Sequence, residues 1–332
     1  MTRLILSLLV LISISAFGQD HDYKIKENKI NKHATDLSLV LNPVFTDVSN
    51  DNIAAGYSAD FLLRLNTIMS FRGSYLGSYY NIEPTQENAT SGVYNGVLDG
   101  KYVPFQYYHG EVTLYLYTDV YEANVKVNMP TEIRNGEKQH SYLELEKVDK
   151  MRQVGIRVGG GQYTGQLKEK GFEFHGVDES KPISDINRIT DLDNSLNDNF
   201  SSISYDLISA GLTYESVSHL VVDIADSIGV KTKKSQWMIY ADGLYGMNIQ
   251  VGDLLTAEDV LGVKVETAYS LDTYTELAEF GYRVGFEHNM TSKVGWSYGI
   301  ELGARPGTGT FGQRTYVSAK VGVSFNFKTI KY

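Results

Sequence analysis

Apolar and polar residues alternate with a period of two near the C-terminal end of the chain. Between Arg314 and Phe327 one face of the segment is apolar, and the other face carries small and polar side chains. Such alternation places successive side chains on opposite faces of a β-strand. The segment is also longer than the roughly 9–11 residues that a tilted strand needs to cross a bilayer. The apolar face, which we predict to contact lipid, consists of Val317, Ala319, Val321, Val323, Phe325 and Phe327.

The same alternation recurs in nine further segments. Leu37, Leu39, Leu41 and Phe45 form the apolar face of the first of them, which Pro43 interrupts. The apolar face of segment 202–217 is ambiguous. Trp237 and Trp296 lie on apolar faces, so we predict that both contact lipid. The ten segments are 37–45, 57–66, 69–79, 111–116, 153–158, 202–217, 237–248, 282–287, 294–304 and 314–327.

This pattern predicts an all-β fold, a transmembrane antiparallel up-and-down β-barrel of about ten strands. Eight or twelve strands also fit, because bacterial single-chain barrels have even strand numbers. A soluble β-sandwich alternates as well, but the strand lengths and the aromatic residues near strand ends favour the barrel. The composition agrees, with 24 Tyr, 13 Phe and 31 Gly but only 6 Pro.

The N-terminus has the features of a secretory signal peptide. Residues 1–19 contain the charged Arg3, an apolar run from Leu4 to Ile14, and small residues before Gln19. The apolar run is too short for a transmembrane helix. We therefore predict a signal peptide at 1–19, a flexible segment at 20–34, and a single barrel domain at 35–328. Export in this form indicates the outer membrane of a Gram-negative bacterium.

The spacing of the strands predicts long loops on one side and an unusual insertion on the other. With both termini in the periplasm, loops at about 81–107, 165–201 and 249–279 face the cell surface. The insertion at 118–150 is predicted to be a long periplasmic hairpin, because Asn135-Gly136 is a strong hairpin-turn signal. The acidic run 191–198 could hold Ca²⁺, although it lacks the glycine and terminal glutamate of an EF-hand; a solvated acidic loop is the simpler interpretation.

Charged residues fall on the opposite face from the apolar one, which places them in the barrel lumen. Five acids and five bases balance, and buried charges are costly unless they are paired. Because a barrel of about eight strands is just filled by its side chains, we predict a lumen closed by a charge network rather than a wide pore. Its predicted members are Asp60, Arg64, Arg72, Glu111, Arg157, Asp242, Arg283, Glu287, Glu301 and Lys320.

The sequence offers little for catalysis or cofactor binding. The seven histidines are scattered, and no pair has the spacing of metal ligands. His140-Ser141 has no acidic partner that the sequence identifies. The chain has no cysteine, and its net charge of −10 argues against nucleic acid as a partner. We expect no cofactor and no enzyme activity.

The signal peptide, the alternating strands and the aromatic-rich last strand resemble those of bacterial outer-membrane β-barrel proteins of the small OmpA-like and porin-family kind. The resemblance implies an outer membrane protein beta-barrel domain that contacts outer-membrane lipid and is inserted by the barrel-assembly machinery. In that family the last residue is commonly aromatic and in phase with the lipid face. Here Tyr332 is out of phase with Phe327.

Three functions fit these features. We expect a structural or scaffold barrel whose loops or periplasmic hairpin bind a periplasmic or outer-membrane protein partner. A narrow porin-like channel for ions or small solutes is the alternative, and a surface-facing hydrolase is the third. The balanced lumen charge favours the scaffold.

Overall fold

A computed structural model contains a barrel strand at each of the ten segments that the sequence predicted. The described residues are 23–27, 30, 35–49, 53–81, 105–128, 132–134, 137–139, 142–169, 199–224, 229–251, 254–260, 263–269, 277–290, 293–308 and 314–327. The signal peptide, most of the acidic loop at 165–201 with its calcium candidate, Asn135-Gly136, His140-Ser141 and Tyr332 lie outside these residues. Among the described residues, no helix is long and apolar enough to cross a membrane.

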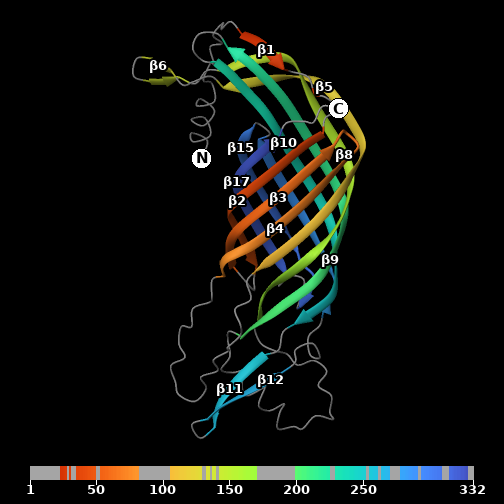
Figure 1. Ribbon diagram of the computed structural model, residues 1–332, viewed down its shortest axis with the longest axis vertical. Helices are drawn as coiled ribbons and strands as arrows, with labels where there is room; N and C mark the ends of the chain where they lie inside the picture. Colours follow the sequence, from red (N-terminus) through yellow and green to blue (C-terminus); the bar gives the residue numbers. More distant parts are fainter. Residues whose placement is uncertain are drawn as a thin grey trace, which may run out of the picture. The chain divides into compact units, whose positions relative to one another are not determined.

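Ten antiparallel strands form a closed barrel. The hydrogen-bonded order is β9-β10-β14-β15-β17-β2-β3-β4-β5-β8, and β8 pairs again with β9 to close the ring. Figure 1 shows the tilted strands β2, β3 and β4 side by side. The prediction of an all-β barrel of about ten strands is confirmed. The barrel strands are β2 (Thr35–Ser49), β3 (Ile53–Leu65), β4 (Met69–Asn81), β5 (Gln106–Asn128), β8 (Tyr142–Glu169), β9 (Asn199–Ile224), β10 (Gly229–Val251), β14 (Phe280–Met290), β15 (Val294–Ala304) and β17 (Thr315–Phe327).

Seven short strands accompany the barrel strands. β1 pairs with β9 at the end of the main sheet, β6 pairs with β7, β11 with β12, and β13 with β16. β1 lies within segment 20–34, which we predicted to be flexible, and β6 and β7 lie within the predicted hairpin at 118–150. The short strands are β1 (Tyr23–Glu27), β6 (Glu132–Arg134), β7 (Glu137–Gln139), β11 (Leu254–Val260), β12 (Val263–Tyr269), β13 (Leu277–Ala278) and β16 (Gly307–Thr308).

A bulge in β2 changes which residues of that strand face inward. The pairing of β2 with β3 shifts register between Asn42 and Phe45, around Pro43, which has no N–H to donate to a neighbouring strand. Leu41 and Val44 are both exposed, at 44% and 57%, whereas Phe45 is buried at 2%. Grouping Phe45 with the apolar outer face was therefore wrong, because the extra residue reverses the alternation after Pro43.

The chain divides into two compact units. The first, here called the barrel unit, comprises 32–118, 153–215 and 236–332. The second, here called the accessory unit, comprises 1–31, 119–152 and 216–235. Strands β5, β8, β9 and β10 contribute residues to both units, which explains why they run to 23, 28, 26 and 23 residues.

The accessory unit has a hydrophobic core of its own. Leu145 and Val222 are fully buried, and Leu220 and Ile224 are nearly so. Ile25 of β1 packs against this cluster. Burial of apolar side chains away from water is the usual arrangement of a soluble domain. The buried members of the cluster are Val125, Val127, Leu143, Leu145, Val148, Leu220, Val222 and Ile224.

Candidate functional site

The outer face of the barrel unit is apolar. Val317, Val321 and Phe327 are 48%, 47% and 53% exposed, and Trp296 is 63% exposed. The other residues predicted to contact lipid, Ala319, Val323, Phe325 and Trp237, are half-buried. Many strands expose large apolar side chains, and the charged side chains lie inside. This distribution is the opposite of that in a soluble protein, which buries its apolar side chains. This is the distribution that a β-barrel needs to span a membrane.

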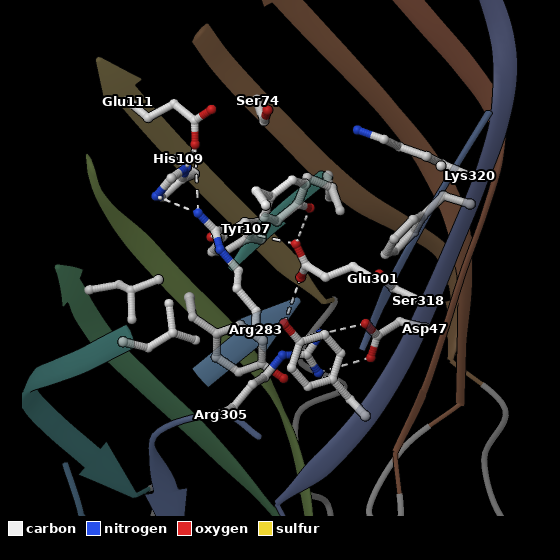
Figure 2. Close-up of a pocket in the computed structure, with 18 of the residues that line it drawn as sticks. Asp47, Ser74, Tyr107, His109, Glu111, Arg283, Glu301, Arg305, Ser318 and Lys320 are labelled. Atoms are coloured by element: carbon white, nitrogen blue, oxygen red, sulfur yellow. Dashed lines mark hydrogen bonds and ion pairs between the residues drawn. The ribbon is translucent and has the colours of Figure 1, made fainter. Parts of the chain in front are cut away.

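Arg283 lies at the centre of a buried charge network in the lumen. Its guanidinium Nε is 2.7 Å from Asp242 Oδ2, and its Nη groups approach Glu301 at 3.8 Å and Glu111 at 3.6 Å. Arg157 also pairs with Glu111 and lies 3.2 Å from Asp242. Figure 2 shows Arg283 between Glu111 and Glu301. Each carboxylate therefore meets at least one guanidinium, so neither sign of charge is buried unpaired.

A second group of ion pairs continues this network along the lumen. Lys320 Nζ lies 2.9 Å from both Asp60 and Glu287. Arg72 pairs with Glu287 at 2.5 Å and reaches Glu111 at 3.7 Å. Arg72 thus links the two groups. The structure joins nine of the ten predicted lumen charges in one continuous network, and the tenth, Arg64, lies elsewhere.

Arg64 belongs to a separate polar layer that the sequence did not predict. It pairs with Glu215, which also accepts hydrogen bonds from the Tyr115 hydroxyl at 2.6 Å and from the Gln236 amide at 2.9 Å. Glu215 is 2% exposed. The sequence missed it because the apolar face of segment 202–217 was ambiguous. The burial of Tyr205, Leu207 and Glu215 now fixes that face.

A third group of residues combines an ion pair with aromatic rings. Arg305 forms two hydrogen bonds with the Asp47 carboxylate, and its guanidinium lies 3.7 Å from the centroid of the Tyr316 ring. The rings of Phe105 and Tyr163 lie 5.6 Å and 5.1 Å from it. Figure 2 shows Arg305 beside Asp47. The sequence missed this pair because the bulge at Pro43 is what turns Asp47 inward.

These residues surround a small cavity. Its volume is about 70 Å³, and its lining includes Arg283, Glu301, Arg305 and Tyr107. A cavity of this size holds a few water molecules, whereas pockets for drug-sized ligands measure about 300–1,000 Å³. The lumen around it is therefore filled by paired side chains rather than open to a solute.

One buried constellation has the residue types of a hydrolase. His109 Nε2 lies 3.0 Å from Ser209 Oγ, and His109 Nδ1 lies 3.6 Å from Glu111 Oε2. A catalytic imidazole must accept the serine proton. Here, however, Arg283 Nη2 also lies 3.4 Å from the same Nε2, so a cation faces the nitrogen that would have to accept the proton. His109 and Ser209 are 5% and 3% exposed, so both side chains are buried in the lumen.

The described residues contain no group of three or more His, Cys, Asp or Glu side chains that could hold a metal ion. Of the seven histidines, only His109, His219 and His288 lie within the described residues.

Comparisons with known proteins give weak likenesses only. No family model matches the chain, and no curated protein matches it. Among solved structures, a TodX monoaromatic hydrocarbon channel with a deltaS2S3 mutation is 10% identical over 90% of this chain and 91% of that chain, with a TM-score of 0.28. The P. putida toluene transporter TodX is 9% identical, with coverages of 95% and 92% and a TM-score of 0.24.

A loop-deletion mutant of OmpT, an outer membrane protein of Vibrio cholerae, is also similar. It is 11% identical over 89% of this chain and 100% of that chain, with a TM-score of 0.19. Identities and TM-scores this low assign no function to the chain. The finer resemblance to small OmpA-like barrels stays a prediction.

Proposed function

We propose that this chain is an outer-membrane barrel with a closed lumen, which anchors the accessory unit as a scaffold for a protein partner. The observation that carries the proposal is the continuous charge network across the barrel interior. Arg72, Arg157 and Arg283 each bridge at least two carboxylates, so opening a path for ions requires several buried pairs to break together. Breaking even one such pair is costly.

The accessory unit supplies the scaffold part of the proposal. It is formed from segments 119–152 and 216–235 together with β1, and its apolar core is separate from the barrel interior. A periplasmic turn in such barrels is usually short, and long ordered insertions are commonly functional. With both chain ends in the periplasm, as the signal peptide implies, the accessory unit would present its surface to periplasmic or outer-membrane proteins.

Conductance in planar bilayers tests the closed lumen. Refolded wild-type protein should give no steady single-channel openings. A triple variant with Arg72, Arg157 and Arg283 replaced by Ser removes the bridging cations, and should give openings if it still folds. Steady openings of the wild-type protein would contradict the proposal and support the narrow channel.

Partner retention tests the scaffold. The variant replaces 121–147 with a tight turn, and its insertion is checked by heat-dependent migration on gels. After mild isolation from the native membrane, a specific protein that accompanies the full chain should be absent from the shortened one. A shortened barrel that inserts normally and keeps every accompanying protein would rule out the scaffold role.

A further inference from the structure

One edge of strand β5 has no described strand beside it in the accessory unit. Within the barrel unit β5 pairs with β4, and this pairing ends where Leu114 lies opposite Met69, the first residue of β4. Strand β5 continues to Asn128, and its other neighbour is β8. Among the strands that the structure describes, none therefore covers the β4 side of β5 from Asp119 to Asn128. We call this side the β5 edge.

The direction of the hydrogen bonds along β5 shows which residues present their backbone at this edge. Tyr115 N–H donates to the Ile68 carbonyl oxygen at 2.8 Å, on the side of β4. Residues two apart along a strand direct their backbone groups to the same side. The buried positions of β5 are odd-numbered in both units, as expected of a strand without a bulge. The N–H and C=O groups of Ala123 and Val125 therefore face the β5 edge.

Strand β10 has a comparable edge in the accessory unit. Its neighbour β14 has 11 residues and begins beside Gly246, whose N–H donates to the Glu279 carbonyl oxygen at 2.7 Å. Because antiparallel strands pair residue by residue, β14 reaches back only to about residue 235 of β10. The first residues of β10, from Gly229 onward, lie beyond it. This stretch contains three lysines, Lys231, Lys233 and Lys234.

The two edges differ in their protection against pairing. Lysines, prolines, bulges and short length are the usual means by which an edge strand avoids joining another chain. The edge of β10 is short and rich in lysine. The β5 edge has one lysine, Lys126, and no proline between Asp119 and Asn128. A long, regular edge without protection is suited to accept another strand through backbone hydrogen bonds.

The side chains beside the β5 edge form two rows. Val125 of the inward row is 4% exposed and belongs to the accessory core. The outward row consists of Glu122, Asn124 and Lys126, which are all exposed. Lys126 Nζ lies 4.3 Å from the centroid of the Tyr142 ring, a contact that leaves its positive charge in place. An added strand would continue both rows, with apolar residues inward and with charges opposite Glu122 and Lys126.

We infer that the β5 edge binds an extended segment of a partner protein as an additional antiparallel strand. Because the added strand runs in the opposite direction, its acidic residue lies opposite Lys126, and a basic residue four positions later lies opposite Glu122. Apolar residues and one polar residue alternate between them. This inference rests on the proposed scaffold role, for which it names the binding edge and the chemistry of the partner. It does not depend on the closed lumen.

A second copy of the chain has a matching sequence but an unsuitable geometry. The segment from Glu122 to Lys126 is complementary to itself when two strands run antiparallel. Two copies in one membrane are related by an axis along the membrane normal, so their β5 strands could pair antiparallel only if both lay in the membrane plane. However, β5 is one continuous strand from Gln106 to Asn128, and strands of membrane barrels are tilted by about 35–45° from the barrel axis. A segment that is not fixed in a barrel has no such restriction.

A synthetic peptide of residues 119–128 carries the required spacing of acid and base and serves as the probe. The full chain is placed in nanodiscs, which leave both membrane sides accessible, and binding of the fluorescein-labelled peptide is followed by anisotropy. The peptide should bind saturably. Exchanging its glutamate and lysine reverses both charge pairs and should weaken binding about tenfold. Absence of saturable binding to the wild-type chain would overturn the inference.

The variant Ala123→Pro removes one N–H from the β5 edge and leaves the groups that face β8 in place. It should weaken peptide binding about tenfold. The matched control Ala123→Val keeps the N–H and should bind the peptide as the wild-type chain does. Unchanged hydrogen exchange in 142–150 would show that β8 is intact in both variants. Equal affinities of the two variants would contradict binding at this edge.

Two N-methylated peptides test the same contact without any change in the protein. Methyl groups on one alternating set of peptide amides should abolish binding, because those amides pair with β5. Methyl groups on the other set should leave binding unchanged, because those amides point away. Equal effects of the two sets would show that the peptide does not bind as a strand.

Isolation from the native membrane separates this inference from the proposed function. If the Ala123→Pro chain keeps a protein that the chain shortened at 121–147 loses, the scaffold role stands and the β5 edge is not its binding site. If the shortened chain keeps every accompanying protein, the scaffold role fails and the inference fails with it. Disulfide-linked dimers of Asn124→Cys in vesicles would assign the edge to a second copy and overturn the partner segment.

Discussion

The barrel unit and the accessory unit bury opposite kinds of side chain, although the same strands build both. Strand β5 shows the change within one element. In the barrel unit its buried positions include Glu111 and Thr113, whereas Leu114 and Leu116 are 47% and 70% exposed. Further along, in the accessory unit, Val125 and Val127 are the buried positions. The buried positions stay odd-numbered, but their chemistry changes from polar to apolar.

This difference shows what the alternation of apolar and polar residues reveals about a strand. A period of two residues separates the two faces of the strand but does not say which face is buried. The chemistry of each face gives that information. A strand whose outward face is apolar is suited to a lipid surrounding, whereas a strand whose inward face is apolar and whose outward face is polar is suited to water. The switch along β5 therefore marks where the strand leaves one environment for the other.

The largest effect is expected from breaking the charge network of the barrel unit. Arg283→Ala leaves Asp242, Glu301 and Glu111 with fewer cationic partners and should lower the free energy of unfolding by roughly 3–5 kcal/mol. Denaturant titration of protein refolded in vesicles measures it. In the accessory unit, Arg152→Ala breaks a pair with Asp119 whose side chains are 46% and 32% exposed, so its effect should stay below about 1 kcal/mol. Equal losses of unfolding free energy for Arg283→Ala and Arg152→Ala would show that the ion pairs of the barrel unit are no more stabilising than those of the accessory unit.

A somewhat smaller effect is expected from the core of the accessory unit. Leu145 is fully buried there, and Leu145→Ala should destabilise the accessory unit by about 2–5 kcal/mol through the cavity it leaves. Faster hydrogen exchange in 142–150 and 219–224 should report it. The control Leu212→Ala removes a side chain that is 61% exposed on the barrel unit and should leave exchange in those segments unchanged. Faster exchange in the control would mean that the accessory core is not independent.

The third effect concerns the two faces of β17. Ala319 lies opposite the exposed Ile300, so Ala319→Arg places a charge in hydrocarbon and should cost about 2–4 kcal/mol at the bilayer midplane. Ser318 lies opposite Glu301 on one side and Asp47 on the other. Ser318→Arg therefore gains carboxylate neighbours and should cost less. Equal destabilisation in vesicles would show that the phase of this strand is wrong.

Much of the barrel could be predicted from the sequence, because each strand carries its own alternation. The ten predicted segments correspond to the ten barrel strands. The predicted phase of the first strand was wrong after Pro43, where the bulge turns Phe45 inward.

The accessory unit and the detailed pairing could not be predicted in the same way. The core brings Ile25, Leu145 and Val222 together, and nothing in the alternation of any one segment says that these distant segments meet. Likewise, the sequence identified Arg72 and Glu287 as inward residues, but their pairing across the lumen depends on strand order and register. Glu215 was missed because the apolar face of segment 202–217 was ambiguous, and the pair of Arg305 with Asp47 was missed because the bulge at Pro43 turns Asp47 inward.

The central claim is that the barrel spans a membrane, with apolar side chains facing lipid and charged side chains in the lumen. Site-directed fluorescence along β17 tests this claim most directly. The chain has no cysteine, so single cysteines from Thr315 to Phe327 can each carry a fluorophore without removal of native thiols. In vesicles that contain a nitroxide-labelled acyl chain, quenching should rise and fall with a period of two, with maxima at Val317, Ala319, Val321 and Val323. Uniformly low quenching, or quenching by an aqueous agent at those same positions, would contradict the claim.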